Sequence, residues 1–303
     1  MGARAQIGQD TMTHNRAPML HDHASLIVYG DDRPGIVAAV AGMLARHGAN
    51  IVALDQHTDD VEAGAFFQRT VVHVKDLAAA LPALEKDLAG TVGDELGLRW
   101  RLRDLSVPLR VAILASKSDH CLLDLLWRQR RGELPAVVPM VISNHPDVAD
   151  DVRFFGVPFF HVPSQGGDKR AAEAELLRLL AGNADLIVLA RYMQILSGSF
   201  IEQVNVPIIN IHHSFLPAFV GAGPYQKAKD RGVKLVGATA HYVTEDLDEG
   251  PIIEQDVVRV SHRDSVAELV RRGADIERQV LSRAVLWHCQ DRVIRHANQT
   301  IVF

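Results

Sequence analysis

Cysteine is scarce in this chain, and positive charge is not in excess. Only two cysteines occur among 303 residues, Cys121 and Cys289, and both stand in apolar segments. So few cysteines do not build a disulfide framework, and no Cys/His spacing indicates structural zinc, so we expect a protein of the reducing cytoplasm. Lysine and arginine number 32 against 37 aspartates and glutamates, a formal net charge of −5. This balance gives no electrostatic reason to expect nucleic acid or an anionic membrane as a partner.

Long hydrophobic runs are also missing. Nowhere do ~18 apolar residues follow one another, so the sequence predicts no membrane-spanning helix. Residues 1–23 lack the apolar core of a signal peptide, and their mixed polar composition predicts a disordered extension. The whole chain is 48% hydrophobic and 23% charged, as in ordinary globular proteins, and its length predicts one large or two medium domains.

Residues 24–105 have the pattern of a small α+β domain. Strands are expected at 25–30, 49–58, 66–74 and 96–105. Helices are expected at 34–47, opened by a proline, and at 76–88. The resulting order, βαββαβ, predicts a ferredoxin-like sandwich.

The turn after the first strand of this domain carries a recognisable motif. The segment DDRPGIVAAVAGMLARHGANI, residues 31–51, resembles the ACT regulatory domain. That resemblance implies pairing between copies, so a homo-oligomer (dimer or tetramer) is expected, and it implies a small amino-acid effector. The effector would contact the turn at Asp32, Arg33, Gly35 and Ile36. A turn that serves only as a tight connection in an assembly unit stays an open alternative, because a fold alone does not set function.

Residues 106–303 alternate between strands and helices, which predicts a mostly parallel, Rossmann-like sheet with right-handed crossovers. Strands are expected at 110–115, 136–142, 158–161, 185–190, 206–211 and 235–243. Helices are expected at 119–131, 168–181, 222–231 and 266–289.

Polar side chains appear where two of these strands end. Asn210 and His212 alternate along the strand in PIINIHHSFLP, so both point to one side. The strand at 235–243 runs into an acidic turn that contains Asp248. Ligands of open α/β sheets bind at the carboxyl edge of the strands. There an amide and an imidazole can stabilise negative charge on a carbonyl oxygen, while a carboxylate orients the imidazole or a water. Taken alone, the asparagine and the aspartate are equally compatible with cap and turn roles.

Several motifs between residues 207 and 255 occur together and in order: Asn-Ile-His, Ser-Phe-Leu-Pro, Gly-Ala-x-Pro-Tyr, Gly-Ala-Thr-Ala-His-Tyr-Val and Asp-Glu-Gly-Pro-Ile-Ile. This region resembles the folate-dependent formyltransferase and hydrolase superfamily. The resemblance implies that the catalytic residues are Asn210, His212 and Asp248, with no metal and no redox cofactor. It also implies folate contacts, assigned here to Met193, Ile195, Leu196, Thr244 and Glu245.

Three neighbouring positions are less determined by the sequence. His213 follows His212 directly, and because neighbours on a strand face opposite ways, the pair is not expected to share a metal ion. His241 is expected either to support the catalytic residues or to be an ordinary buried histidine. Gly223 stands where the superfamily often has a larger polar residue, so no ligand contact is assigned to it.

The turn after the first strand of the second domain bears on the acceptor. Residues 115–121, Ala-Ser-Lys-Ser-Asp-His-Cys, contain no glycine and include Asp119, which disfavours a phosphorylated acceptor. Joined to an ACT-like domain, this core resembles the hydrolase branch of the superfamily. The resemblance implies hydrolysis of the linear amide of 10-formyltetrahydrofolate to tetrahydrofolate and formate, in one-carbon metabolism and purine biosynthesis. A formyltransferase acting on a small amine and a non-catalytic regulator that binds folate or an amino acid remain alternatives.

Overall fold

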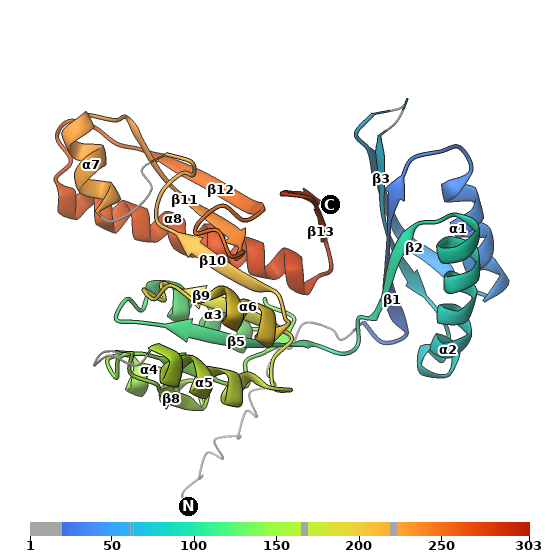
Figure 1. The fold of residues 1–303 in the computed structure, drawn as a ribbon, viewed down its shortest axis with the longest axis horizontal. Helices are drawn as coiled ribbons and strands as arrows, with labels where there is room; N and C mark the ends of the chain where they lie inside the picture. Colours follow the sequence, from blue (N-terminus) through green and yellow to red (C-terminus); the bar gives the residue numbers. More distant parts are fainter. Residues whose placement is uncertain (1–19, 61, 63, 165–168, 219–222) are drawn as a thin grey trace, which may run out of the picture.

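The computed structural model describes residues 20–60, 62, 64–164, 169–218 and 223–303. These residues form two lobes, each built around its own sheet (Figure 1). Residues 1–19, most of the extension expected at 1–23, lie outside the described residues, and the first strand already begins at His23. No helix of the described ranges is both long enough and apolar enough to cross a bilayer. Both cysteines are free and buried.

The first lobe has the predicted order βαββαβ. Its elements are β1 (His23–Asp31), α1 (Ile36–Arg46), β2 (Asn50–Thr58), β3 (Ala65–His73), α2 (Leu77–Leu88), the π-helical η1 (Ala89–Glu95) and β4 (Arg99–Asp104). The strands form an antiparallel sheet in the order β2-β3-β1-β4. Ile36, Val40 and Met43 recur at helical spacing along α1 and are buried, which fixes this helix on the sheet. The helix begins after Gly35, whose φ of 95° favours glycine, rather than at the proline.

The second lobe is a mixed, mostly parallel sheet, as predicted. Its elements begin with β5 (Leu109–Ala115), α3 (His120–Arg130), β6 (Ala136–Val137), β7 (Val141–Ser143), α4 (Ala149–Phe154), β8 (Phe159–His161), α5 (Lys169–Leu180) and β9 (Leu186–Ala190). They continue with α6 (Gly198–Val204), β10 (Ile208–His212), α7 (Pro224–Arg231), β11 (Leu235–Tyr242), β12 (Ile252–Arg259), α8 (Val266–Cys289), β13 (Val293–His296) and β14 (Gln299–Val302). The sheet order is β12-β11-β10-β9-β5-β7-β8, with β6 paired to β5, and only β11 and β12 run antiparallel to their neighbours.

Some of these elements were not predicted from the sequence. The edge strand β12 is largely solvent-accessible and carries Glu254, Gln255 and Asp256 in succession, so it lacks the apolar alternation that marks a strand. Helices α4 and α6 are only 6 and 7 residues long, too short for a periodic signal. Residues 168 and 222, expected as helix ends, lie outside the described residues.

The two lobes meet at the C-terminal end of α8. Ile27 and Phe67, on the sheet face of the first lobe that is turned away from α1, pack against Ile294 of the β13–β14 hairpin. Arg69 donates hydrogen bonds to the carbonyl oxygens of Gln290 (3.0 Å) and Asp291 (2.9 Å), just beyond the helix. Cations at this end of a helix complement its dipole and bind its last carbonyls, so the first lobe caps α8.

Candidate active site

Strands β10 and β11 bring an asparagine and a histidine together. Asn210 pairs with His241 in the antiparallel register, and its Nδ2 lies 3.2 Å from His241 Nε2. The opposite ring nitrogen, Nδ1 of His241, lies 3.0 Å from the carbonyl oxygen of Tyr242 and donates to it. In the neutral ring Nε2 is therefore the acceptor, so His241 fixes the orientation of the Asn210 amide. This contact fits the supporting role expected for His241, and the ring is also buried, as the alternative role requires.

Asp248 reaches the same place from the loop between β11 and β12. A Cβ on Gly250 would lie 1.8 Å from the carbonyl oxygen of Tyr242, so only glycine lets this loop fold back against β11. The backbone N–H of Tyr242 donates to the carbonyl of Pro251 at 2.9 Å. Asp248 itself has a φ of 60°, a left-handed conformation that aspartate tolerates. The turn thus aims its carboxylate at β10.

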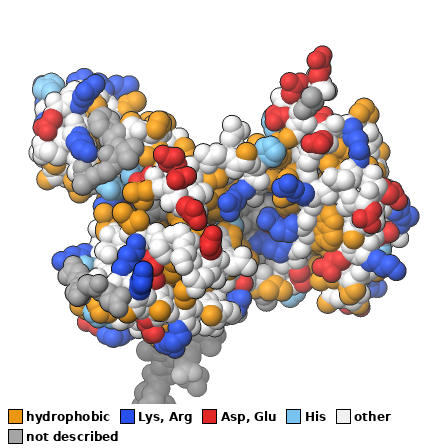
Figure 2. All heavy atoms as spheres, viewed as in Figure 1, with side chains coloured by type: hydrophobic (Ala, Val, Ile, Leu, Met, Phe, Trp, Pro, Cys, Tyr) orange, Lys and Arg blue, Asp and Glu red, His pale blue; other side chains and the backbone are white. Residues whose placement is uncertain are grey.

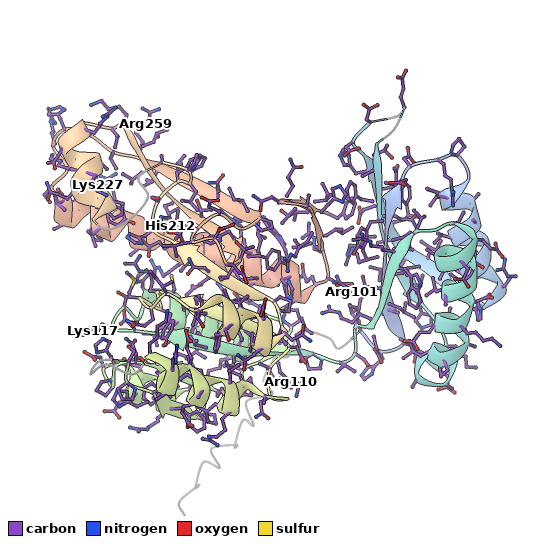
Figure 3. The ribbon with its side chains drawn as sticks, in the orientation of Figure 1. Arg101, Arg110, Lys117, His212, Lys227 and Arg259 are labelled. Atoms are coloured by element: carbon purple, nitrogen blue, oxygen red, sulfur yellow. The ribbon has the colours of Figure 1, made fainter. Side chains whose placement is uncertain are left out.

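The carboxylate of Asp248 contacts both histidines. Its Oδ2 lies 3.2 Å from Nδ1 of His212, and its Oδ1 lies 3.7 Å from Nε2 of His241. The hydrogen bond from Nδ1 of His212 is the main reason why the pKa of the Asp248 carboxyl lies far below its usual range. The structure therefore brings Asn210, His212 and Asp248 into one cluster at the carboxyl edge of the sheet, where Figure 3 labels His212.

One atom of this cluster has no protein partner. Nε2 of His212 is buried and makes no hydrogen bond to any described residue, whereas Nδ1 of the same ring faces Asp248. Buried polar groups are normally satisfied, so an unpartnered one beside an oriented amide marks a place where a ligand atom binds. A carbonyl oxygen at that place would accept a hydrogen bond from the amide and, when both ring nitrogens carry a proton, a second one from the imidazole.

His213 is placed differently from the sequence prediction. Because β10 ends at His212, the two imidazoles do not face opposite ways; their rings stack with centroids 5.3 Å apart and an angle of 30° between them. The His213 ring also lies 6.2 Å from that of Tyr225. Burial and the positive charge of Arg191 lower the pKa of His213 to about 4, so it is neutral at pH 7.

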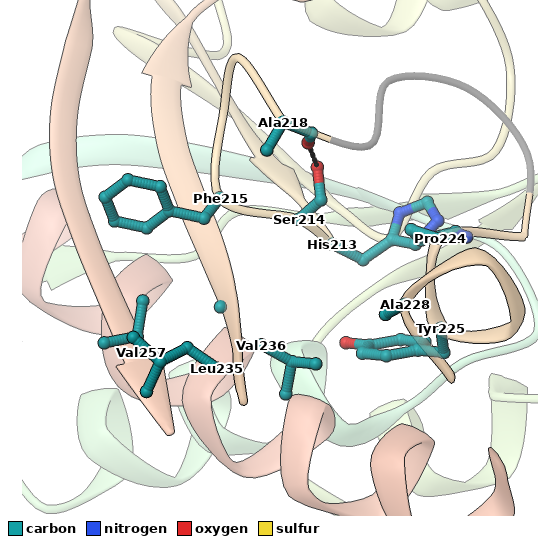
Figure 4. Close-up of a pocket in the computed structure, with 11 residues that line it drawn as sticks. His213, Ser214, Phe215, Ala218, Pro224, Tyr225, Ala228, Leu235, Val236 and Val257 are labelled. Carbon is teal, nitrogen blue, oxygen red and sulfur yellow. Dashed lines mark hydrogen bonds between the residues drawn. The ribbon is translucent and has the colours of Figure 1, made fainter. Parts of the chain in front are cut away.

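His213 lies beside an apolar cavity. It has a volume of about 320 Å³ and lies between β11, β12, α7 and the segment after β10 (Figure 4). His213 and Tyr225 lie at one side of it, and Phe215 and Val257 lie at the other. Ser214 turns its hydroxyl away from solvent by donating to the carbonyl of Ala218 at 2.8 Å. The cavity supplies a nonpolar wall beside the site rather than further reacting groups.

A second ionic cluster lies behind His213, and the sequence analysis missed it. Glu277 of α8 is 2% exposed, accepts a hydrogen bond from the Tyr225 hydroxyl at 2.7 Å and lies 2.8 Å from Nε2 of His120. Nε of Arg191 lies 3.5 Å from the same carboxylate. A Cβ on Gly273 would lie 1.9 Å from the Tyr225 hydroxyl, so this glycine lets Tyr225 reach Glu277. A signal existed, since Glu277 falls on the buried apolar face of α8.

This second cluster contains residue types that bind metals. His120, Cys121 and Glu277 place one potential ligand atom each within 4.8 Å of one another. Burial, and then the charge of Glu277, raises the pKa of the Cys121 thiol far above its usual value, which opposes the thiolate that a metal needs. Burial alone would raise the pKa of Glu277, but His120, Arg191 and Tyr225 outweigh it and lower that pKa to about 2. The negative charge of the Glu277 carboxylate is thus balanced by protein groups, and we assign no metal here.

The residues predicted to contact folate lie on two loops near the cluster. Met193 and Ile195 follow β9 and are 57% and 61% exposed, while Leu196 packs against the core. On the loop after β11, the Thr244 hydroxyl donates to the carbonyl of Asp246 at 3.1 Å, so it is engaged in its own turn. Glu245 lies over Gly198, at the start of α6, because a Cβ there would come within 2.9 Å of its Oε1. The two loops are therefore neighbours.

The turn after β5 uses its polar side chains internally. The Ser116 hydroxyl donates to Oδ1 of Asn144 at 2.6 Å and accepts a hydrogen bond from the backbone N–H of Met193 at 3.0 Å. His120, which begins α3, is bound to Glu277. These contacts tie the turn to the loop after β9 and to α8, in place of an open cradle for a phosphate.

The predicted effector turn is partly engaged. Arg33 donates to the carbonyl oxygen of Leu96, and the backbone N–H of Asp32 donates to the carbonyl of Gly64 at 2.9 Å. The Ile36 side chain is 1% exposed in the core, so only its backbone is open to a ligand. Gly223, with a φ of 67°, caps the start of α7, and a Cβ there would meet no atom of the described residues within 4 Å.

Comparisons with known proteins agree with this two-lobe architecture. The ACT domain model matches residues 24–89, and the formyl transferase model matches residues 109–285. The glycinamide ribonucleotide transformylase 1 of Symbiobacterium toebii, a solved structure, is 32% identical with a TM-score of 0.62 and covers 65% of this chain and 94% of its own.

Two further relatives match both lobes. The formyltetrahydrofolate deformylase of Mycobacterium tuberculosis (strain ATCC 25618 / H37Rv) is 62% identical, over 93% of this chain and 91% of the relative. The crystal structure of a formyltetrahydrofolate deformylase from Pseudomonas syringae pv. tomato str. DC3000 is 46% identical, with a TM-score of 0.88, over 93% of this chain and 94% of that one. With this identity across both lobes, the chain belongs to the formyltetrahydrofolate deformylase family.

Proposed function

We propose that this deformylase hydrolyses 10-formyltetrahydrofolate to tetrahydrofolate and formate at the cluster of Asn210, His212 and Asp248. One observation carries the placement of the chemistry: the buried Nε2 of His212 has no hydrogen-bond partner among the described residues, beside an amide that His241 holds in place. The formyl oxygen is the ligand atom that this arrangement suits, because it gains negative charge when water adds to the carbonyl.

The reaction begins with attack of a water oxygen on the formyl carbon. The carbonyl π electrons move to the formyl oxygen, where the Asn210 N–H and a protonated His212 Nε2 stabilise the oxyanion. Collapse of this tetrahedral intermediate re-forms the carbonyl and breaks the bond to N10 of the folate, which leaves with that electron pair. A proton that originates from the water reaches N10, so the products are formate and tetrahydrofolate.

Asp248 orients the reacting groups and does not act as a lasting proton acceptor. Its depressed pKa makes it a weak base and a good hydrogen-bond acceptor. At 3.2 Å from Nδ1 of His212, its negative charge stabilises positive charge on that ring. The same carboxylate accepts a hydrogen bond from the attacking water and points its lone pair at the formyl carbon.

The folate is proposed to lie between the loops after β9 and β11. Met193 and Ile195 are large apolar side chains left in the open, which suits stacking against a flat heteroaromatic ring. Leu196, Thr244 and Glu245 complete the contacts on the two neighbouring loops. The internally bonded turn at Ser116 supports water, rather than a phosphorylated amine, as the acceptor.

The decisive assay supplies the purified chain with 10-formyltetrahydrofolate, with and without glycinamide or glycinamide ribonucleotide, and measures formate. Water-only release at an unchanged rate is expected. Turnover that requires an amine would establish a transferase, and binding without turnover would establish a regulator. His212→Gln should reduce kcat by about 10³-fold because the oxyanion loses its donor, while His262→Gln, an exposed histidine, should leave kcat unchanged.

We further propose that residues 24–105 form a regulatory domain and residues 106–303 the catalytic one. The match to the ACT domain supports an amino-acid effector at the turn from Asp32 to Ile36 and a homo-oligomer. The edge strand β2, whose Val52 is 55% exposed, offers unpaired backbone for contact between copies. Light scattering measures the oligomer, and kinetics with and without amino acids in Arg33→Gln test the turn.

A further inference from the structure

A large cavity lies at the junction of the lobes, apart from the catalytic cluster. Its volume is about 940 Å³. Both lobes line it, among others with Arg69, Val71, Arg103, Val137, Phe154 and Gln290. Figure 2 shows basic side chains gathered between the two lobes, near the position that Figure 3 labels Arg101, a residue that does not itself line the cavity.

The charged residues that line this cavity are mostly basic, although Nη1 of Arg69 also lies 3.6 Å from the carboxylate of Asp55, which does not line it. Arg69 and Arg103 enter it from the first lobe and Arg130 from the second, where its guanidinium lies 5.7 Å from the centre of the Phe154 ring. Glu133, the one acidic residue among the described residues that line it, already pairs with Arg128 and Arg131 outside the cavity.

Arg103 is incompletely satisfied. It donates from Nη2 to the carbonyl of Cys289, at the end of α8, but its Nε is buried and has no hydrogen-bond partner among the described residues. Burial lowers the pKa of Arg69 and of Arg103, which shows that both guanidinium groups carry a desolvation cost that nearby negative charge offsets only in part. A ligand anion would complete that compensation.

Apolar side chains form another part of the wall, beside the polar Ser106, Gln129 and Gln290. Val137 is 41% exposed and Phe154 74% exposed, and Val71 lies on the opposite lobe. Exposed large hydrophobic side chains that gather in a hollow mark a binding surface. Guanidinium groups at one part of the cavity and aliphatic or aromatic walls at another match a ligand with one anionic head and one apolar tail.

We propose that this cavity between the lobes binds a small carboxylate with an apolar tail. The carboxylate accepts hydrogen bonds from Arg103 and Arg69, and the tail packs against Val71, Val137 and Phe154. This site is separate from the reaction and from the turn at Asp32, and it stands whether or not the proposed hydrolysis holds. Two sources share the required chemistry, an apolar amino acid and a simple carboxylic acid.

Titration calorimetry of the full chain tests the proposal with three probes of one shape. 4-Methylpentanoate has the head and the tail, L-leucine adds an ammonium group, and 4-methylpentan-1-ol lacks the negative charge. We expect at least one carboxylate to bind at one site per chain, and the alcohol to bind at least about tenfold more weakly. Binding of 4-methylpentanoate alone identifies a simple acid as the ligand class, and preference for leucine identifies an amino acid.

Variants locate the site. Arg103→Gln should lower the affinity for the carboxylate at least about tenfold, because it removes a charged hydrogen-bond donor. Val137→Glu should also weaken carboxylate binding, because its negative charge repels the ligand. Val137 is an exposed position of the wall, so this change removes no contact between the lobes. Arg101→Gln is the matched control, because Arg101 lies on the same strand as Arg103 and pairs with Asp291, yet does not line the cavity. Arg33→Gln controls for the turn at Asp32, and both controls should bind as the wild type does.

Three results would overturn the proposal. One is the absence of binding by either carboxylate, and another is equal affinity for the alcohol. The third is loss of binding in Arg33→Gln together with unchanged binding in Arg103→Gln and Val137→Glu, which would move the site to the turn.

Discussion

Asp248 and Glu277 are two carboxylates beside histidines, yet their surroundings differ in what they leave open. Asp248 sits on a loop at the sheet edge, 13% exposed, and its partner His212 keeps a free buried nitrogen. Glu277 sits in the middle of α8, 2% exposed, with His120, Tyr225 and Arg191 around it. Both pKa values are depressed. In the first cluster, Nε2 of His212 has no hydrogen-bond partner among the described residues. In the second, the Glu277 carboxylate contacts His120, Tyr225 and Arg191.

The difference shows what identifies a reacting group. Perturbed pKa values occur in structural ion networks as well as in active sites, so the shift alone does not separate the two. An unpartnered nitrogen does not separate them either, since Nε and Nη1 of Arg191 in the second cluster are unpartnered among the described residues, as Nε2 of His212 is in the first. The features that separate the clusters are the oriented Asn210 amide and the position of Asp248 on a loop at the carboxyl edge of the sheet. We therefore expect Asp248 to govern turnover and Glu277 to govern stability.

The largest effect is expected for Asp248→Asn. Asparagine keeps the size of the side chain and tolerates the φ of 60° at this position, so folding should be preserved. Without the negative charge, the His212 ring loses the partner that orients it and that stabilises positive charge developing on it, so kcat for formate release should fall about 10³-fold with little change in KM. Asp246→Asn, two residues away on the exposed part of the loop, is the control and should retain full activity. Activity of Asp248→Asn within tenfold of the wild type would remove Asp248 from the mechanism.

Glu277→Gln should reverse this pattern. It leaves Arg191 and His120 beside a neutral amide in a buried site, so the free energy of unfolding at pH 7 should drop by about 3 kcal/mol. The kcat should fall less than tenfold, because no reacting atom contacts Glu277. Urea unfolding followed by circular dichroism measures the first quantity. Asp275→Asn, an exposed pair with Arg278 on the same helix, is the control and should cost less than about 1 kcal/mol.

The same variant gives a pH signature. The pKa of Glu277 is about 2 in the folded chain against a reference of 4.5, so folding favours its ionised form. Its contribution to stability is fully present above about pH 4.5 and is lost as the pH falls toward about 2. The stability gap between wild type and Glu277→Gln should therefore narrow over that range. A gap that stays constant down to pH 2 would mean that the carboxylate is not the source of the stability.

The two clusters also differ in how far the sequence predicts them. Asn210 and His212 alternate at the end of one apolar strand, and Asp248 follows another strand, so a local pattern and sheet topology bring them together. Helix α8 was predicted with its observed bounds, 266–289, because its apolar period is long and regular. The hairpin partner β12 was missed, because its polar residues hide the strand period.

The Glu277 cluster could not be predicted in this way. Its members come from α3, the residue after β9, α7 and α8, and only tertiary packing places them around one carboxylate. The cavity between the lobes has the same origin, since it depends on how two domains meet. The sequence shows only that a charged residue, Glu277, falls on the apolar face of α8. It does not show which residues surround that carboxylate.

A smaller effect is expected for Tyr225→Phe. The change removes the hydroxyl that donates to Glu277 but keeps the ring beside His213. Loss of one hydrogen bond to a buried charge should lower the free energy of unfolding by about 2 kcal/mol, and kcat should stay within about twofold. Formate-release assays measure kcat, and urea unfolding measures the free energy of unfolding. A fall in kcat beyond tenfold at unchanged stability would mean that the Tyr225 hydroxyl reaches the reacting atoms, and that the second cluster belongs to the chemistry.

The smallest effect is expected at the end of α8 that the first lobe caps. Arg101→Gln removes the partner of the Asp291 carboxylate, which is 4% exposed, while Arg69 still holds the neighbouring carbonyls. Since Arg101 is itself 55% exposed, the loss in free energy of unfolding should be only about 1 kcal/mol. Asp248 lies on a loop between β11 and β12 and not on α8, so kcat should not change. A measurable fall in kcat would show that movement of α8 reaches the Asp248 cluster, because the substitution alters nothing near that cluster directly.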